Sequence, residues 1–150
     1  MPFGSAGPGL PLTGAASART NSVPTVADFF ANLDDLVATS TVTIDRWRGH
    51  AHPRFPDVVY PLDYGHLDNS RSSDGAEVDV FVGTARGAGV ISVLLTADPR
   101  KRDVELKILL DCTPAEVEQA RRFCSEVLGT GGHLVERDDL ARGDRSRPGK

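Results

Sequence analysis

Four aspartates between residues 74 and 103 are the side chains whose type and spacing could do chemistry. They fall on short connections beside apolar strands, at Asp74, Asp79, Asp98 and Asp103. Mg²⁺ takes oxygen ligands and keeps several of its own waters, so carboxylates placed in this way suit a hard divalent cation. Asp74-Gly75 could instead be a turn, and the other acids a solvated strand face. The spacing alone leaves both interpretations open.

The loop after the first expected strand concentrates arginines between turn-forming residues, at Arg46, Arg48 and Arg54. Guanidinium groups can bind phosphate oxygens through two parallel hydrogen bonds. They could equally pair with surface carboxylates. His50 and His52 share a face if this loop is extended, but no third soft ligand is near in the sequence. We therefore favour polar loop residues over a transition-metal site.

Two helices and a set of strands must position these residues. One helix is expected from Thr25, which can cap it, and a second from Thr113, where Thr-Pro-Ala-Glu forms a capping box and Gly129 ends the helix. Alternating or continuous apolar patterns predict strands at residues 41–45, 57–67, 76–82, 90–95 and 103–110, with 133–136 as a further short strand.

The period of two assigns the charged residues to one side of their strands. In the strand at 76–82 the even-numbered residues form an apolar row, so Asp79 points away from that row. In the strand at 103–110, Asp103, Glu105 and Lys107 line the face opposite the apolar residues. Two acids and a lysine in a row are usually a solvated face, and only the other acids nearby make this row a candidate site.

Length and composition bound the class of protein. The 150 residues predict one domain at 24–136, a disordered leader at 1–23 and a charged flexible tail at 137–150. The net charge of −4 argues against nucleic acid as a partner, and the chain lacks an apolar run long enough to span a membrane. Two cysteines are too few for a disulfide framework, and the N-terminus lacks a signal-peptide pattern, so we expect a cytoplasmic protein.

The order of these pieces resembles the soluble family I inorganic pyrophosphatases, and specifically a short bacterial variant of them. The similar core runs from about Thr41 to Leu110. Tyr60-Pro-x-x-Tyr-Gly followed by Asp74-Gly-x-x-x-Asp-Val-x-Val is similar to that family's Tyr-Pro-x-x-Tyr-Gly and Asp-x-Asp-Pro-x-Asp segments. The aspartates at 98 and 103 match its next acidic pair. The combination is far more specific than any single piece.

The resemblance implies a fold that is α+β and mainly β, with a small closed β-barrel of the OB-like pyrophosphatase type flanked by two helices. It also implies pyrophosphate as a small-molecule substrate, and it leaves a homo-oligomer open. The implied Mg²⁺ ligands are Asp74, Asp79, Asp98 and Asp103. The implied substrate-binding residues are Arg54, Tyr60, Tyr64 and Lys107. The residues with an implied part in catalysis are Asp79, Asp103 and Tyr64.

The sequence departs from the family's pattern at several positions. Ala76 stands where the family has the acid that orients or deprotonates the attacking water. Thr41 and Thr43 replace a Lys-x-Glu pair, and Glu105 replaces a lysine, with Lys107 one same-face step further. We expect Mg²⁺-dependent hydrolysis of pyrophosphate to two phosphates. The alternatives are a weakened relative that binds metal–phosphate ligands or acts as an interaction module, and hydrolysis of another phosphoanhydride.

The metal interpretation predicts that Asp79→Asn and Asp103→Asn each abolish most Mg²⁺-dependent phosphate release, because they remove ligand charge with little change in volume. Both variants should keep their fold in circular dichroism. Asp111→Asn, at the far end of its strand, should change the release rate little. Equal behaviour of all three variants would contradict this assignment of the site.

Overall fold

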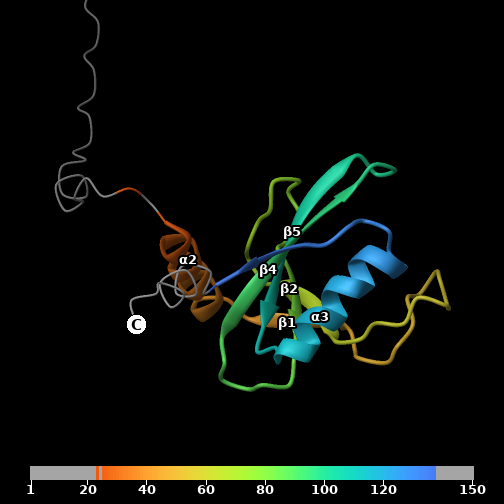
Figure 1. Cartoon of the computed structure of the whole chain (residues 1–150), viewed down its shortest axis with the longest axis horizontal. Coiled ribbons are helices and arrows are strands. Elements are labelled where there is room, and N and C mark those ends of the chain that lie inside the picture. The colour runs from red at the N-terminus through yellow and green to blue at the C-terminus, as the bar shows by residue number, and fades with distance from the viewer. Residues whose placement is uncertain (1–22, 24, 138–150) are drawn as a thin grey trace, which may run out of the picture.

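The computed structural model describes residue 23 and residues 25–137, so nearly all of the expected leader and tail lies outside the described residues. Figure 1 shows a sheet with helices packed on it. The strands are β1 (Val42–Arg46), β2 (Asp63–Leu67), β3 (Asp79–Val82), β4 (Val90–Asp98), β5 (Asp103–Leu110) and β6 (His133–Glu136). The helical segments are α2 (Val26–Ala38), α3 (Pro114–Arg122) and the π-helix η1 (Phe123–Val127). Over these residues, no helix has the length and apolar character needed to cross a membrane.

The six strands form one sheet in the order β1-β2-β3-β5-β4-β6. All neighbouring strands pair antiparallel except β3 and β5, which run parallel. The outer strands are β1 and β6, and within residues 25–137 no pairing joins them, so the sheet is open. The expected class, α+β and mainly β with two flanking helices, is confirmed, whereas the expected closure into a barrel is not.

Both faces of the sheet are buried at its centre. On one face, Phe30 and Leu33 of α2 pack with residues such as Val80 of β3. On the other, Phe123 at the end of α3 packs with residues such as Phe81 of β3. Successive residues of a strand point to opposite faces, so adjacent residues of β3 enter the two different cores. In Figure 1 the sheet accordingly lies between α2, drawn in orange, and α3, drawn in blue.

Two local expectations about strands are wrong. The strand expected at 76–82 begins only at Asp79, and Ala76 is exposed in a bend before it. The backbone groups of Ala76 are already used, because its N–H donates to Asp74 Oδ1 and its carbonyl accepts from the backbone N–H of Ser72. Of the stretch expected at 57–67, only Asp63–Leu67 forms a strand. Pro61, just before it, has no N–H to give to a ladder.

Both expected helix starts are confirmed, each with a complete capping box. In the second box the Glu116 carboxylate is 6% exposed and accepts from the backbone N–H groups of Thr113 and Thr84 and from the Thr84 hydroxyl. Burial opposes the charge on Glu116, but these hydrogen bonds outweigh it and lower the pKa of the carboxyl group. Glu116 therefore fastens the start of α3 to the turn that follows β3.

Removing this carboxylate should destabilise the fold. We expect Glu116→Ala to lower the free energy of unfolding by about 2 kcal/mol, because it leaves buried donors without acceptors. Since the folded pKa is below the unfolded one, this stabilisation is present above the unfolded pKa and is lost as pH falls through the folded pKa. Glu118→Ala on the same helix breaks only an exposed pair with Arg121 and should cost less than about 1 kcal/mol. Urea unfolding measures both, and equal losses would contradict the role of Glu116.

Candidate functional site

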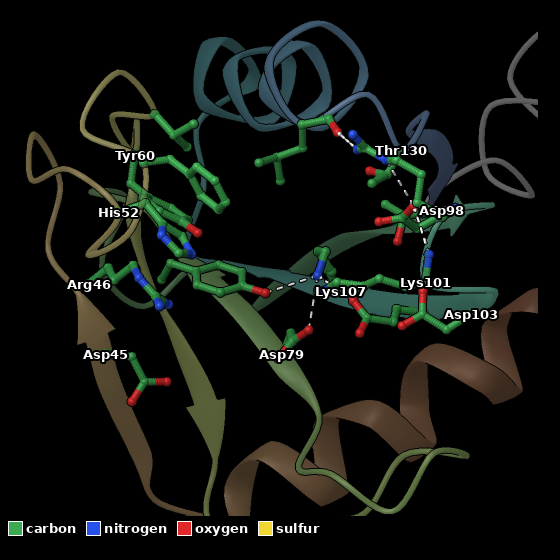
Figure 2. A pocket seen from close by; sticks show the side chains of 17 residues that line it. Asp45, Arg46, His52, Tyr60, Asp79, Asp98, Lys101, Asp103, Lys107 and Thr130 are labelled. Atoms are coloured by element: carbon green, nitrogen blue, oxygen red, sulfur yellow. Dashed lines mark hydrogen bonds and ion pairs between the residues drawn. The ribbon is translucent and has the colours of Figure 1, made fainter.

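A cavity of about 450 Å³ lies where the ends of several strands meet the loop after β1. It is lined on one side by Arg46, His52 and the Tyr60 ring, and on the other by the β4–β5 turn (Figure 2). Its acidic residues are Asp45, Asp79, Asp98, Asp103 and Glu105. Its cationic residues are Arg46, Arg100, Lys101 and Lys107. A cavity with both signs of charge can bind an anion together with a metal ion.

Lys107 is the central residue of the cavity floor. Lys107 belongs to β5, and it is the register partner of Asp79 on the neighbouring strand β3. The ammonium Nζ donates to Asp79 Oδ2 at 2.9 Å, to Glu105 Oε1 at 2.8 Å and to the Tyr64 hydroxyl at 2.9 Å (Figure 2). Lys107 is only 5% exposed. Burial opposes its charge, but Tyr64, Asp79 and Glu105 outweigh burial and raise the pKa of Lys107, so the side chain is a permanent buried cation.

The two tyrosines expected in the site lie side by side on the cavity wall. The ring centroids of Tyr60 and Tyr64 are 5.2 Å apart, and each ring also contacts a core phenylalanine, Phe123 and Phe81 respectively. Burial raises the pKa of both phenols above its ordinary value. Both hydroxyls are therefore protonated at neutral pH. The Tyr64 hydroxyl accepts from Lys107 and is also hydrogen-bonded to the Asp79 carboxylate, so both neighbours fix its position.

Arg46 reaches the cavity because the pairing of β1 with β2 is irregular between Ile44 and Arg46. The chains approach so closely there that a Cβ on Gly65 would collide with the backbone of Ile44. The Arg46 guanidinium lies 5.5 Å from the centroid of the Tyr60 ring. Its Nε is buried and has no hydrogen-bond partner among the described residues. Arg46 as a residue lines the cavity, where its positive charge would favour an anionic ligand.

The expected arginine of the phosphate site, Arg54, is exposed and does not line the cavity. Its backbone N–H donates to Nδ1 of His52, which does line the cavity. Burial and the charges of Arg46, Arg54 and Lys101 lower the pKa of His52, so this imidazole is neutral at pH 7. The structure thus brings Arg46, His52 and Lys101 to the cavity, and the sequence pattern assigned none of them to it specifically.

Among the described residues two groups of side chains could hold a metal ion. In the group of His66, Asp68 and Glu77, both ring nitrogens of His66 already bind carboxylates, and the other group contains carboxylates alone. Asp74, Asp103 and Glu105 each offer an oxygen, and these atoms lie within 4.8 Å of one another. Asp74 is fixed by hydrogen bonds from the Ser72 hydroxyl and the Ala76 N–H, which lower the pKa of its carboxyl group. A group of oxygens only is what Mg²⁺ prefers. Two of the four expected metal ligands are therefore together, and Glu105 joins them.

The other two expected metal ligands make different contacts. Asp79 binds the Lys107 ammonium, which also binds Glu105. Asp98 is the Cα partner of Asp103 across the β4–β5 hairpin, but its Oδ1 accepts from the backbone N–H groups of Arg100 and Lys101. Burial opposes the charge on Asp98, and these donors and the two cationic side chains outweigh it and lower its pKa. All of these residues except Asp74 line the same cavity.

Comparison with known proteins connects this geometry to one fold. No family model and no curated protein matches the chain in sequence. An inorganic pyrophosphatase from Coxiella burnetii matches in structure with a TM-score of 0.50 and 13% identity, over 69% of this chain and 88% of that one. An inorganic pyrophosphatase from Neisseria gonorrhoeae gives 0.49 and 15%, over 69% and 86%. An inorganic phosphatase from Anaplasma phagocytophilum gives 0.46 and 18%, over 70% and 88%. The chain therefore has the fold of the Coxiella burnetii inorganic pyrophosphatase, which agrees with the resemblance seen in its motifs.

Proposed function

We propose that this chain hydrolyses inorganic pyrophosphate to two phosphates and needs Mg²⁺ to do so. The observation that carries the proposal is one cavity, in a pyrophosphatase fold, that is lined by two members of an oxygen-only carboxylate group and by cationic residues that can bind an anion. Asp74, Asp103 and Glu105 form the carboxylate group, and Arg46 and Lys101 lie on opposite sides of the cavity (Figure 2).

Several residues of the cavity would bind the substrate, each through a different contact. Pyrophosphate is a dense anion, so the guanidinium of Arg46 and the ammonium of Lys101 would hold its oxygens from two sides. The Tyr64 hydroxyl would contact the substrate by exchanging its hydrogen bond with Asp79 for one to a phosphate oxygen. Apolar rings at Tyr60 and Phe55 line part of the wall and lower the local polarity, which strengthens these contacts.

Asp74, Asp103 and Glu105 would hold Mg²⁺. When bound, this ion supplies a positive charge that neutralises pyrophosphate and lowers the pKa of a coordinated water. Ala76 is exposed outside β3 and has no acid to offer that water. Of the two nearby glutamates that could orient it, Glu105 lines the cavity, whereas Glu77 is 3.5 Å from His66 and does not line it. Of the two, only Glu105 would therefore act on the water, and it would do so through the ion that it helps to hold, because its carboxylate also binds Lys107.

A second candidate function is binding of a metal–phosphate ligand without fast turnover, or hydrolysis of a different phosphoanhydride. Two observations favour it: the missing acid at Ala76, and the Lys107 ammonium that already neutralises Asp79. A phosphate-release assay on pyrophosphate and on nucleotides, with and without Mg²⁺, separates these functions. A cytoplasmic location and a homo-oligomer stay predictions.

Mg²⁺ should stabilise the native state. At a hundredfold excess over Kd, binding to the folded chain alone adds about 2.7 kcal/mol to the free energy of unfolding. We expect a higher Tm in Mg²⁺ than in chelator, together with Mg²⁺-dependent phosphate release from pyrophosphate. Asp103→Asn should lose the Tm difference, whereas Asp45→Asn should keep it, because Asp45 lines the cavity but binds His66 at 2.8 Å. A wild-type Tm that is the same in both buffers would contradict the proposal.

Arg46 and Arg54 can be distinguished by kinetics. We expect Arg46→Gln to raise KM for pyrophosphate by about 10- to 100-fold, which corresponds to about 1.5–3 kcal/mol for hydrogen bonds to a charged group. Arg54→Gln, in the same loop region but outside the cavity lining, should change KM by less than about twofold. Steady-state assays at saturating Mg²⁺ measure both. A larger effect of Arg54→Gln would return the phosphate contact to the residue that the motif resemblance implies.

A further inference from the structure

We propose that the Lys107 ammonium acts as a built-in cation between Asp79 and Glu105, and that the cavity therefore takes one divalent ion rather than two. This inference rests on the proposed function, because it concerns how many metal ions the same site binds. It assigns Lys107 to holding and neutralising carboxylates, and not to direct contact with the substrate.

The position of the ammonium is fixed by three strands. Lys107 and Glu105 lie two residues apart on the same face of β5, Asp79 is the register partner of Lys107 on β3, and Tyr64 comes from β2. An ammonium has three N–H donors, and here the three donors have three acceptors at 2.8–2.9 Å. The buried Lys107 side chain therefore has no donor left for a phosphate oxygen.

A metal ion between Asp79 and Glu105 would have to occupy the place of this Nζ. Carboxylates that lie close together repel one another and raise one another's pKa values unless a cation sits among them. Lys107 supplies that cation. A divalent ion bound to the same two carboxylates would be repelled by the ammonium charge and would clash with the ammonium group. In the second oxygen-only group, Asp74 with Asp103 and Glu105, Lys107 binds only Glu105, so Asp74 and Asp103 remain to hold an ion. The ammonium thus leaves one position for a divalent ion.

The test is Lys107→Met, which keeps the length of the side chain and removes its charge. Calorimetric titration with Mg²⁺ should give one ion per wild-type chain and two per Lys107→Met chain. In melts, the variant should have a lower Tm than wild type in chelator, and Mg²⁺ should raise its Tm by more than it raises that of wild type. Lys107→Arg, which keeps the charge, should bind one ion.

A structural ion pair elsewhere provides the matched control. Arg137→Met breaks the pair between Arg137 and Asp34, which joins α2 to the segment after β6 away from the cavity. This variant should also have a lower Tm than wild type in chelator. Mg²⁺ should raise the Tm of the variant by no more than it raises the Tm of wild type. A Lys107→Met chain that behaves like Arg137→Met, or that binds one ion, overturns the inference.

The remaining outcomes also decide the question. A wild-type chain that binds two ions overturns the inference and leaves the proposed function standing, whereas one that binds no Mg²⁺ and releases no phosphate overturns the proposed function as well. If Lys107→Met folds only in Mg²⁺, the inference is supported. If it folds in neither buffer, Lys107→Gln is titrated and melted in the same way, and a Gln variant without the second ion or the larger Mg²⁺ effect overturns the inference.

Discussion

The arrangement of the cavity depends on one buried ammonium. Lys107 Nζ lies within 2.9 Å of acceptors from β2, β3 and β5, so it joins three strands at the place where their charged residues would otherwise repel. Breaking a buried ion pair by removing one partner leaves an uncompensated charge and typically costs about 3–5 kcal/mol. The same three hydrogen bonds of Lys107 therefore shape the cavity and stabilise the sheet, and a substitution of Lys107 should affect both.

The sheet accommodates this charge because each strand changes character along its length. In β5 the residues at its end, Ile108 and Leu109, enter the two cores, while Asp103 and Glu105 at its start reach the cavity. The same face is therefore apolar beneath α3 and polar beside it. Phe81 and Phe123 close the apolar part against the tyrosines, which explains why the Lys107 side chain is buried and the Tyr64 side chain is partly buried, although both border a cavity.

Local signals in the sequence predicted what depends on near neighbours. The capping boxes at Thr25 and Thr113 are confirmed, because side chain and backbone lie within one turn. The grouping of Asp74 with Asp103 also follows the expectation. Phe81 lies on the same face as Asp79, as the period of two requires, but that period does not show that Phe123 covers it. The cavity position of Arg46 depends on an irregularity in strand pairing, and that of Lys107 on a parallel register between strands that are distant in the chain. The local pattern shows neither the irregularity nor the parallel register, although the period of two already placed Lys107 on the face of Asp103 and Glu105.

A lysine and a metal ion are not equivalent solutions to the same repulsion. The ammonium is covalently attached, so the carboxylates are neutralised and the cavity is formed at any Mg²⁺ concentration. It carries a single charge and cannot lower the pKa of a water as a divalent ion does. In the proposed function, a chain that exchanges one ion for Lys107 gains a preformed cavity and loses part of its means of activating water. Ala76 has a similar consequence, because it has no carboxylate that could act on the water. Under the proposed function, both departures would weaken the activation of the water more than the binding of the anion.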